Sequence, residues 1–156
     1  MAAVSEMELV AMPGADDVHV VLIESLAEED AAVADAVRES GGTATAFSID
    51  LADAKAIEDT SATIAREIGI PDMLINNAGA GRWLPLLKTT AKEALAMIEV
   101  PYLAAFNLTR AFLPYMLTRG SGAIACVTSP GSYVVWPNAN AYIAARHALK
   151  GFTDAL

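Results

Sequence analysis

The sequence MLINNAGAG, residues 73–81, joins a short apolar run to a polar turn that contains two glycines. The apolar run, residues 73–75, is typical of a brief buried strand. Residues 76–81 follow it directly and therefore lie at a strand end. In an open parallel sheet, ligands bind at the carboxyl ends of the strands. The stretch thus indicates an α/β fold and marks residues 76–81 as part of a candidate site.

The rest of the chain alternates between short apolar runs and longer amphipathic segments. Strands are predicted at residues 18–23, 43–49, 73–75 and 123–128, and helices at residues 27–40, 54–68, 90–116 and 141–156. We expect Asp53 and Thr90 to cap two of these helices and Pro101 to interrupt the longest one. Strands separated by helices of this length form βαβ units, hence a three-layer parallel sheet covered on both faces. A single α/β domain is expected over residues 1–156, with residues 1–17 as an atypical N-terminal stub.

The composition is that of a globular protein with an acidic surface. Apolar residues make up 54% of the chain, charged residues make up 19%, and the formal net charge is −9. Because such a surface repels phosphate backbones, no nucleic acid is expected as a partner. A nucleotide is still compatible, since backbone N–H groups can hold a pyrophosphate. The longest apolar stretch contains Asn107 and Arg110, and the N-terminus lacks a signal-peptide pattern, so we expect a cytoplasmic protein without a membrane span.

Cysteine and histidine usage argues against a metal site. Cys126 is the single cysteine, and its apolar surroundings predict a buried core thiol. His19 and His147 are far apart in the sequence and have no ligand-like spacing. We expect no bound metal.

Ser129, Tyr142 and Arg146 are the residues whose types and spacing indicate chemistry. Tyr142 and Arg146 are four residues apart, so they share one face of the predicted helix. A cation beside a tyrosine favours the phenolate, and a serine at a strand end can hold a carbonyl or hydroxyl oxygen. Together they would suit proton transfer coupled to hydride transfer. A tyrosine on an amphipathic helix commonly serves packing. Spacing alone therefore leaves a catalytic role and a packing role open for Tyr142.

Taken in order, the motifs at residues 74–79, 128–129 and 142–146 resemble those of the short-chain dehydrogenase/reductase family. That family has an N-N-A-G turn, a serine at a strand end and Y-x-x-x-K on the following helix. The resemblance implies a Rossmann-like fold and NAD(P)-linked interconversion of a small-molecule alcohol and ketone. It also implies that Ser129 polarises the substrate oxygen and that Tyr142 is the acid–base. Arg146 stands at the position of the family's lysine.

The resemblance further implies a set of cofactor contacts. The residues concerned are Glu24, Asp50, Leu51, Asn77, Ala78 and Gly79. Asp50 and Leu51 would border the adenine. The other residues, Asn77, Ala78 and Gly79, would line the cofactor side of the sheet. Asn77 is equally compatible with a turn former that satisfies its own backbone. Glu24 falls where an acid accepts hydrogen bonds from the adenosine ribose, which favours NAD over NADP, or it is simply an exposed acid.

Four features depart from the family's pattern. Arg146 has a planar fork that does not replace a compact ammonium, so weakened activity is expected. Pro101 stands where family members often carry an asparagine that supports a proton-relay water, and proline offers no polar side chain. The family's first strand and Gly-rich phosphate loop are absent, since only the isolated Gly14 precedes the strand at residue 18. We expect residues 7–12 to supply a substitute strand or helical stub. The family's last two strands and its substrate loop are also missing.

Three functional hypotheses remain open at this point. The chain is a truncated, degenerate dehydrogenase with weak or lost activity, a non-enzymatic relic that binds a partner, or an incomplete reading of a longer active protein. For the second, a homo-oligomer would form through helices 90–117 and 141–156. The apolar residues available are Leu103, Phe106, Leu113, Met116, Ala145, Leu149 and Phe152. Ordinary core burial is the other interpretation of these residues.

Overall fold

The computed structural model describes residues 8–12, 19–24, 27–79 and 81–156. Its strands are β1 (Glu8–Met12), β2 (His19–Glu24), β3 (Thr43–Ser48), β4 (Met73–Asn76) and β5 (Ala123–Cys126). Its helices are α1 (Ala27–Glu39), α2 (Ala54–Glu67), α3 (Ala91–Ile98), α4 (Ala105–Arg119) and α5 (Asn140–Ala155). Short helical segments are η1 (Leu86–Lys88), η2 (Glu99–Ala104) and η3 (Pro130–Ser132). The elements predicted from the sequence are all present, with ends displaced by at most three residues, and the helix predicted at residues 90–116 is divided into α3, η2 and α4.

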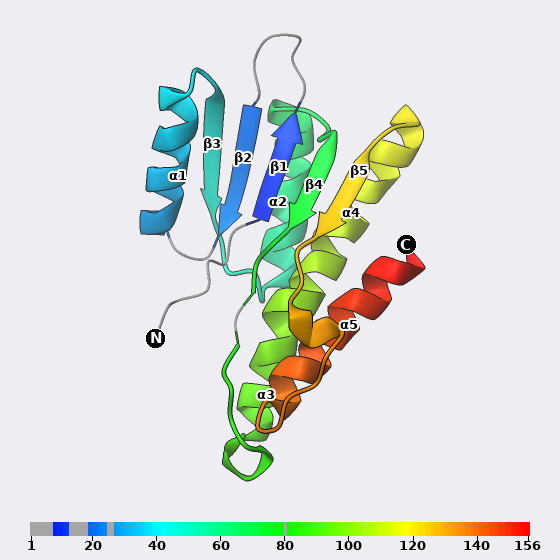
Figure 1. The fold of residues 1–156 in the computed structure, drawn as a ribbon. Helices are drawn as coiled ribbons and strands as arrows, with labels where there is room; N and C mark the ends of the chain where they lie inside the picture. The colour runs from blue at the N-terminus through cyan, green and yellow to red at the C-terminus, as the bar shows by residue number, and fades with distance from the viewer. Residues whose placement is uncertain (1–7, 13–18, 25–26, 80) are drawn as a thin grey trace.

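The five strands form one sheet in the order β3-β2-β1-β4-β5 (Figure 1). The predicted α/β class is confirmed and the four predicted strands run in the same direction, while the substitute strand expected within residues 7–12 is present as β1. β2 pairs with β3 and β4 with β5 in parallel, whereas β1 is antiparallel to both of its neighbours. Residues 13–18 alone connect Met12 to His19, and a parallel crossover needs a dozen residues or more. This connection is too short for a parallel crossover, so β1 pairs with β2 in the antiparallel direction.

Helices cover the two faces of the sheet, as the predicted three layers require. Val21 and Ile23 of β2 pack into the larger core with residues of α2 and α4, whereas Val20 and Leu22 pack against α1. This double burial explains why β2 is a continuous apolar run instead of an alternating one. The larger core contains Leu51, Ile57, Ile64, Leu74, Ala104, Leu108 and Phe112, all at most 1% exposed.

Local signals set the helix boundaries where they were predicted. Asp53 caps α2 by accepting hydrogen bonds from the N–H groups of Lys55 and Ala56, at 2.8 and 3.1 Å. Thr90 caps α3 through a capping box with Glu93. Pro101 lies in the π-helical segment η2 that joins α3 to α4. Because proline has no N–H to give, the regular α-helical bonding is interrupted there.

Two expectations about side-chain burial need adjustment. Cys126 is half-buried instead of buried, because β5 is an edge strand, and its Sγ accepts a hydrogen bond from Asn76 Nδ2 at 3.4 Å. Among the apolar residues considered for an interface, Met116, Ala145 and Leu149 belong to the core, whereas Leu103 and Phe106 are 38% and 39% exposed. In the part of the chain that is described, no helix is both long and apolar enough to cross a membrane.

Candidate active site

The carboxyl ends of β4 and β5 bring the predicted catalytic residues together. These strands are parallel neighbours in register, with Asn76 opposite Cys126, so the segments that follow them leave the sheet side by side. A pocket of about 310 Å³ opens there beside the first turn of α5. Its lining residues are Asn77, Val127, Thr128, Ser129, Pro130, Tyr142 and Arg146. All three predicted catalytic residues and Asn77 therefore share one pocket.

Ser129 is held in place by the short helical segment that it caps. Its Oγ accepts a hydrogen bond from the N–H of Gly131 at 3.1 Å. Its own O–H has no acceptor within the described ranges, so this proton is available for a ligand oxygen in the pocket. A hydroxyl can donate one hydrogen bond while accepting others. The O–H of Ser129 can therefore donate a hydrogen bond to a ligand in the pocket.

Arg146 lies over the ring of Tyr142, one turn further along α5. Its Cζ is 5.2 Å from the ring centroid, and the residue is only 5% exposed. Its Nε is buried and has no hydrogen-bond partner among the described residues. A buried cationic N–H without a partner is costly, so the pocket is suited to a ligand that offers oxygen acceptors beside this group.

Two glycines allow the close packing around these side chains. A Cβ at Gly79 would lie 2.4 Å from Arg146 Nη2, so the guanidinium rests directly on the backbone there. A Cβ at Gly81 would lie 2.3 Å from Tyr142 Cδ2. Any larger residue at these positions would displace the two predicted catalytic groups.

Ser132 is a residue whose role was not predicted from the sequence. It is 2% exposed, its Oγ donates to the backbone oxygen of Arg146 at 2.9 Å, and it is hydrogen-bonded to Thr128 Oγ1. This chain of contacts ties the segment after β5 to α5. Ser132 therefore positions Ser129 relative to Tyr142, and its place three residues after Ser129 was the only signal in the sequence.

The residues predicted to contact a cofactor lie along the same edge of the sheet. Asp50 is exposed after β3 and accepts from the N–H of Ala52 at 2.9 Å, whereas Leu51 is 1% exposed and packs in the core. Ala78 and Gly79 are buried after β4. Glu24 ends β2 opposite Ser48, and its side chain lies outside the described residues. Of the residues in this set whose side chains are described, Asn77 alone lines the pocket with Tyr142.

The direction of β1 determines which of its ends lies at the edge of the sheet that carries the pocket. Glu8 pairs with Ile23 near the carboxyl end of β2, whereas Met12 pairs with His19 at its beginning. The carboxyl end of β1 therefore lies at the edge of the sheet away from the pocket (Figure 1). Gly14, the isolated glycine that precedes β2 in the sequence, lies outside the described residues, as do residues 1–7 and 13–18 on either side of β1.

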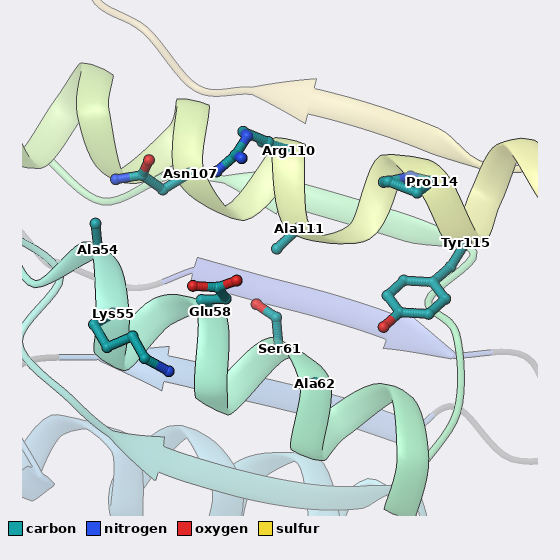
Figure 2. Close-up of a pocket in the computed structure, with 10 residues that line it drawn as sticks. All are labelled: Ala54, Lys55, Glu58, Ser61, Ala62, Asn107, Arg110, Ala111, Pro114 and Tyr115. Carbon is teal, nitrogen blue, oxygen red and sulfur yellow. The ribbon is translucent and has the colours of Figure 1, made fainter.

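A larger pocket, of about 610 Å³, lies between α2 and α4 (Figure 2). Glu58 and Ser61 face it from α2, and Asn107 and Arg110 from α4. None of the predicted catalytic or cofactor residues whose side chains are described lines it. The predicted catalytic residues converge instead on the smaller pocket, which brings together a hydroxyl, a phenol and a cation.

Comparisons with known proteins identify the family of the chain. A sequence profile of the short chain dehydrogenase family matches residues 7–156. A short chain dehydrogenase of Monascus purpureus is 32% identical over 148 residues, which are 92% of this chain and 51% of that protein. The crystal structure of a metagenomic short-chain oxidoreductase in complex with NADP is 30% identical with a TM-score of 0.82, over 86% of this chain and 62% of that one. An NAD+-bound xylitol dehydrogenase has a TM-score of 0.83 at 25% identity, over 88% of this chain and 53% of that one. The chain thus spans about half the length of the curated relative it matches.

Proposed function

The chain belongs to the short-chain dehydrogenase family, and we propose that it is an oxidoreductase that interconverts an alcohol and a ketone with NAD or NADP. One observation carries the proposal: Ser129, Tyr142 and Arg146 line a single pocket at the carboxyl ends of β4 and β5. We expect turnover to be low, because Arg146 stands at the position of the family's lysine and its planar guanidinium does not replace a compact ammonium.

Each of the three residues has a distinct part in the reaction. In the oxidation, Tyr142 takes the proton of the alcohol hydroxyl as the carbinol carbon loses a hydride, and in the reduction it returns that proton. The O–H of Ser129 donates to the substrate oxygen. Arg146, 5.2 Å from the ring centroid, stabilises the negative charge of the phenolate. A nicotinamide dinucleotide, when bound, supplies or accepts the hydride.

The residues fit one end of such a cofactor better than the other. At the nicotinamide end, the buried Nε of Arg146 lacks a partner in the described structure, and ribose hydroxyl oxygens would satisfy it. At the pyrophosphate end, the described residues contain no Gly-rich loop, and the carboxyl end of β1 lies at the opposite edge of the sheet. We therefore expect weak affinity for either dinucleotide. An acid at Glu24 would repel a 2′-phosphate, which makes NAD the preferred cofactor.

Cofactor titration tests the proposal directly. NADH and NADPH are added separately while their fluorescence is followed, and saturable binding in the micromolar to millimolar range is expected, tighter for NADH. Oxidation of secondary alcohols is then measured for Tyr142→Phe, which should be slower by about 100-fold or more. Tyr133→Phe is the matched control, because Lys150 Nζ is also 5.2 Å from that ring centroid. No detectable binding at millimolar cofactor would sink the proposal.

A second function is favoured by a different observation, an aromatic cluster that spans two helices. Phe106 and Phe152 have ring centroids 5.9 Å apart, and Tyr102 lies within 6.4 Å of both. Phe106 and the neighbouring Leu103 are more than one-third exposed. This surface would suit a dimer that forms through α4 and α5. Sedimentation velocity tests it: Phe106→Glu should convert a dimer to a monomer, whereas a monomeric parent protein would exclude this function.

A further inference from the structure

Trp83 and Trp136, the two tryptophans of the chain, come from different loops and stack on each other. Trp83 follows β4 and Trp136 follows β5, and their ring centroids are 5.7 Å apart with an interplanar angle of 23°. Trp83 is 64% exposed, whereas Trp136 is half-buried. The pair therefore presents an open indole surface to solvent, and such apolar surface commonly marks a ligand site.

The tryptophan pair adjoins Tyr142. The centroid of Trp83 is 6.4 Å from that of Tyr142, with the rings tilted by 54°. A Cβ at Gly131 would lie 3.2 Å from Trp136 Cζ3 and 3.3 Å from Tyr142 Cε1, so the backbone of one residue contacts both rings. Tyr142 thus contacts the indole pair and also lines the polar pocket with Ser129.

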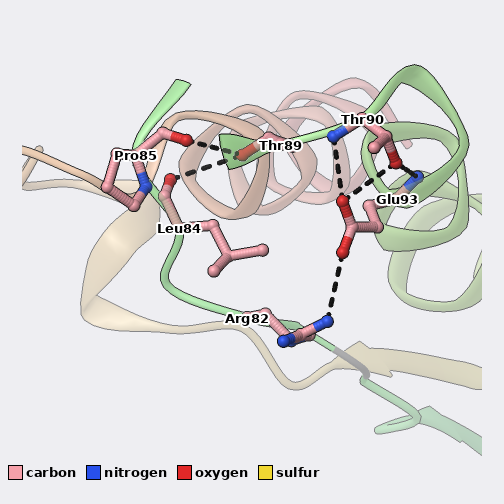
Figure 3. Close-up of polar contacts among 6 residues, drawn as sticks. All are labelled: Arg82, Leu84, Pro85, Thr89, Thr90 and Glu93. Carbon is pink, nitrogen blue, oxygen red and sulfur yellow. Dashed lines mark hydrogen bonds and ion pairs between the residues drawn. The ribbon is translucent and has the colours of Figure 1, made fainter. Parts of the chain in front are cut away.

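The segment that carries Trp83 is fixed by polar contacts, which Figure 3 shows. Arg82 Nη1 donates to Glu93 Oε1 at 3.1 Å. Glu93 Oε2 accepts from the N–H and the Oγ1 of Thr90, each at 2.9 Å. Thr89 Oγ1 donates to the backbone oxygen of Pro85 at 3.1 Å. Ordering an exposed segment costs conformational entropy, so these contacts favour a fixed position for the indole beside Tyr142.

We propose that Trp83 and Trp136 are specificity-determining residues that select a planar aromatic substrate, an alcohol or ketone whose reacting carbon is attached directly to an aromatic ring. The inference rests on the proposed function, which places the reacting oxygen at Tyr142 and Ser129. The aromatic ring of the substrate packs on the exposed indole of Trp83 while its oxygen reaches the phenol. Aromatic contacts prefer offset or tilted geometry, and they add up to about tenfold in affinity beyond the area that they bury.

Intrinsic fluorescence tests the inference without cofactor or turnover. Because the two tryptophans are the stacked pair, the emission of the protein reports on this surface. We expect 1-phenylethanol to change the emission saturably. The matched ligand 1-cyclohexylethanol, which has a similar size but no aromatic face, should bind about tenfold more weakly. Equal affinities for the two alcohols, or no saturable change with either, would overturn the proposal.

Variants separate recognition from chemistry. Trp83→Leu should remove the preference for 1-phenylethanol, with Trp136 left to report binding, and Trp83→Phe should keep most of it. Tyr115→Leu, which alters an exposed aromatic residue of α4 away from the site, should change nothing. Loss of the exciton couplet of stacked indoles in far-ultraviolet circular dichroism, with the helical signal retained, checks that Trp83→Leu is folded. Aromatic binding without any NADH binding would leave the aromatic-binding site standing, while the proposed function and the role in substrate selection fail. NADH binding with no aromatic preference would leave the proposed function standing and overturn this inference.

Discussion

Replacing Gly81 by alanine should displace Tyr142 and destabilise the fold through that one contact. The added Cβ would lie 2.3 Å from Tyr142 Cδ2 and 2.8 Å from Cε2. Carbon atoms in favourable contact are about 3.5–4.0 Å apart, so the ring must move by roughly 1.2 Å. It cannot move freely, because the backbone of Gly131 is close to its Cε1 and Trp83 lies against it.

The cost is that of overpacking, about 1–3 kcal/mol in the free energy of unfolding. In a Tyr142→Ala background the obstructing ring is gone, so the same substitution should cost nothing. It should instead stabilise by about 0.4–1 kcal/mol, because alanine reduces the freedom of the unfolded chain. The coupling between the two substitutions is therefore at least about 1 kcal/mol, well above the 0.5 kcal/mol expected of independent sites.

Urea unfolding of the four proteins of this double-mutant cycle measures the coupling. Gly151→Ala is the control, because Gly151 lies within α5 with nothing within 4 Å of its added Cβ, and alanine there should stabilise by about 1 kcal/mol. If Gly81→Ala has the same cost with and without the ring of Tyr142, the assigned packing is incorrect. In an active protein, a displacement of about 1 Å should also slow turnover by about 100-fold.

Three further substitutions test other parts of the site. Arg146→Lys removes the buried, unpartnered Nε and restores a compact ammonium, so alcohol oxidation should become faster, and an unchanged or lower kcat would contradict the part given to the cation. Ser132→Ala breaks the hydrogen bond to the backbone oxygen of Arg146 and should lower the free energy of unfolding by about 1 kcal/mol, measured in urea, with a fall in kcat. Hydrogen bonds from Thr90 hold the pKa of Glu93 below its usual value of 4.5. The stability that the carboxylate contributes is therefore complete above pH 4.5 and is lost as the pH falls through the lowered pKa. The difference in urea midpoint between the protein and Glu93→Ala should shrink over that window, and a constant difference would mean that the carboxylate charge has no part in the cap.

The elements that depend on local chemistry could be predicted from the sequence. Asp53 and Thr90 cap helices because a side-chain oxygen reaches N–H groups two or three residues away, which spacing alone reveals. Ser129 and Tyr142 could be placed in one site because successive parallel strands bring their carboxyl ends to one edge. The antiparallel direction of β1 follows from local chain length as well, because residues 13–18 are too few for a parallel crossover.

The contacts that depend on distant segments could not be read from spacing. Gly81 and Gly131 close on Tyr142 because segments after two different strands converge, and neither glycine lies at a turn with positive φ that would mark it. Trp83 and Trp136 are 53 positions apart in the numbering (136 − 83), and either indole is compatible with partial burial on its own. Their stacking follows from the pairing of β4 with β5, not from any motif.

The two main departures from the family act on different steps of the proposed reaction. The carboxyl end of β1 lies away from the site edge and the described residues contain no phosphate loop, so we expect weak binding of the dinucleotide. The guanidinium of Arg146 instead lies over Tyr142 within the pocket, where it affects the proton transfer. Because β1 ends at the edge away from the pocket, a change at Arg146 leaves the lost phosphate contacts as they are. A lysine at this position should therefore raise kcat while the affinity for the adenosine half of the cofactor stays low, and restoring that affinity requires a parallel first strand.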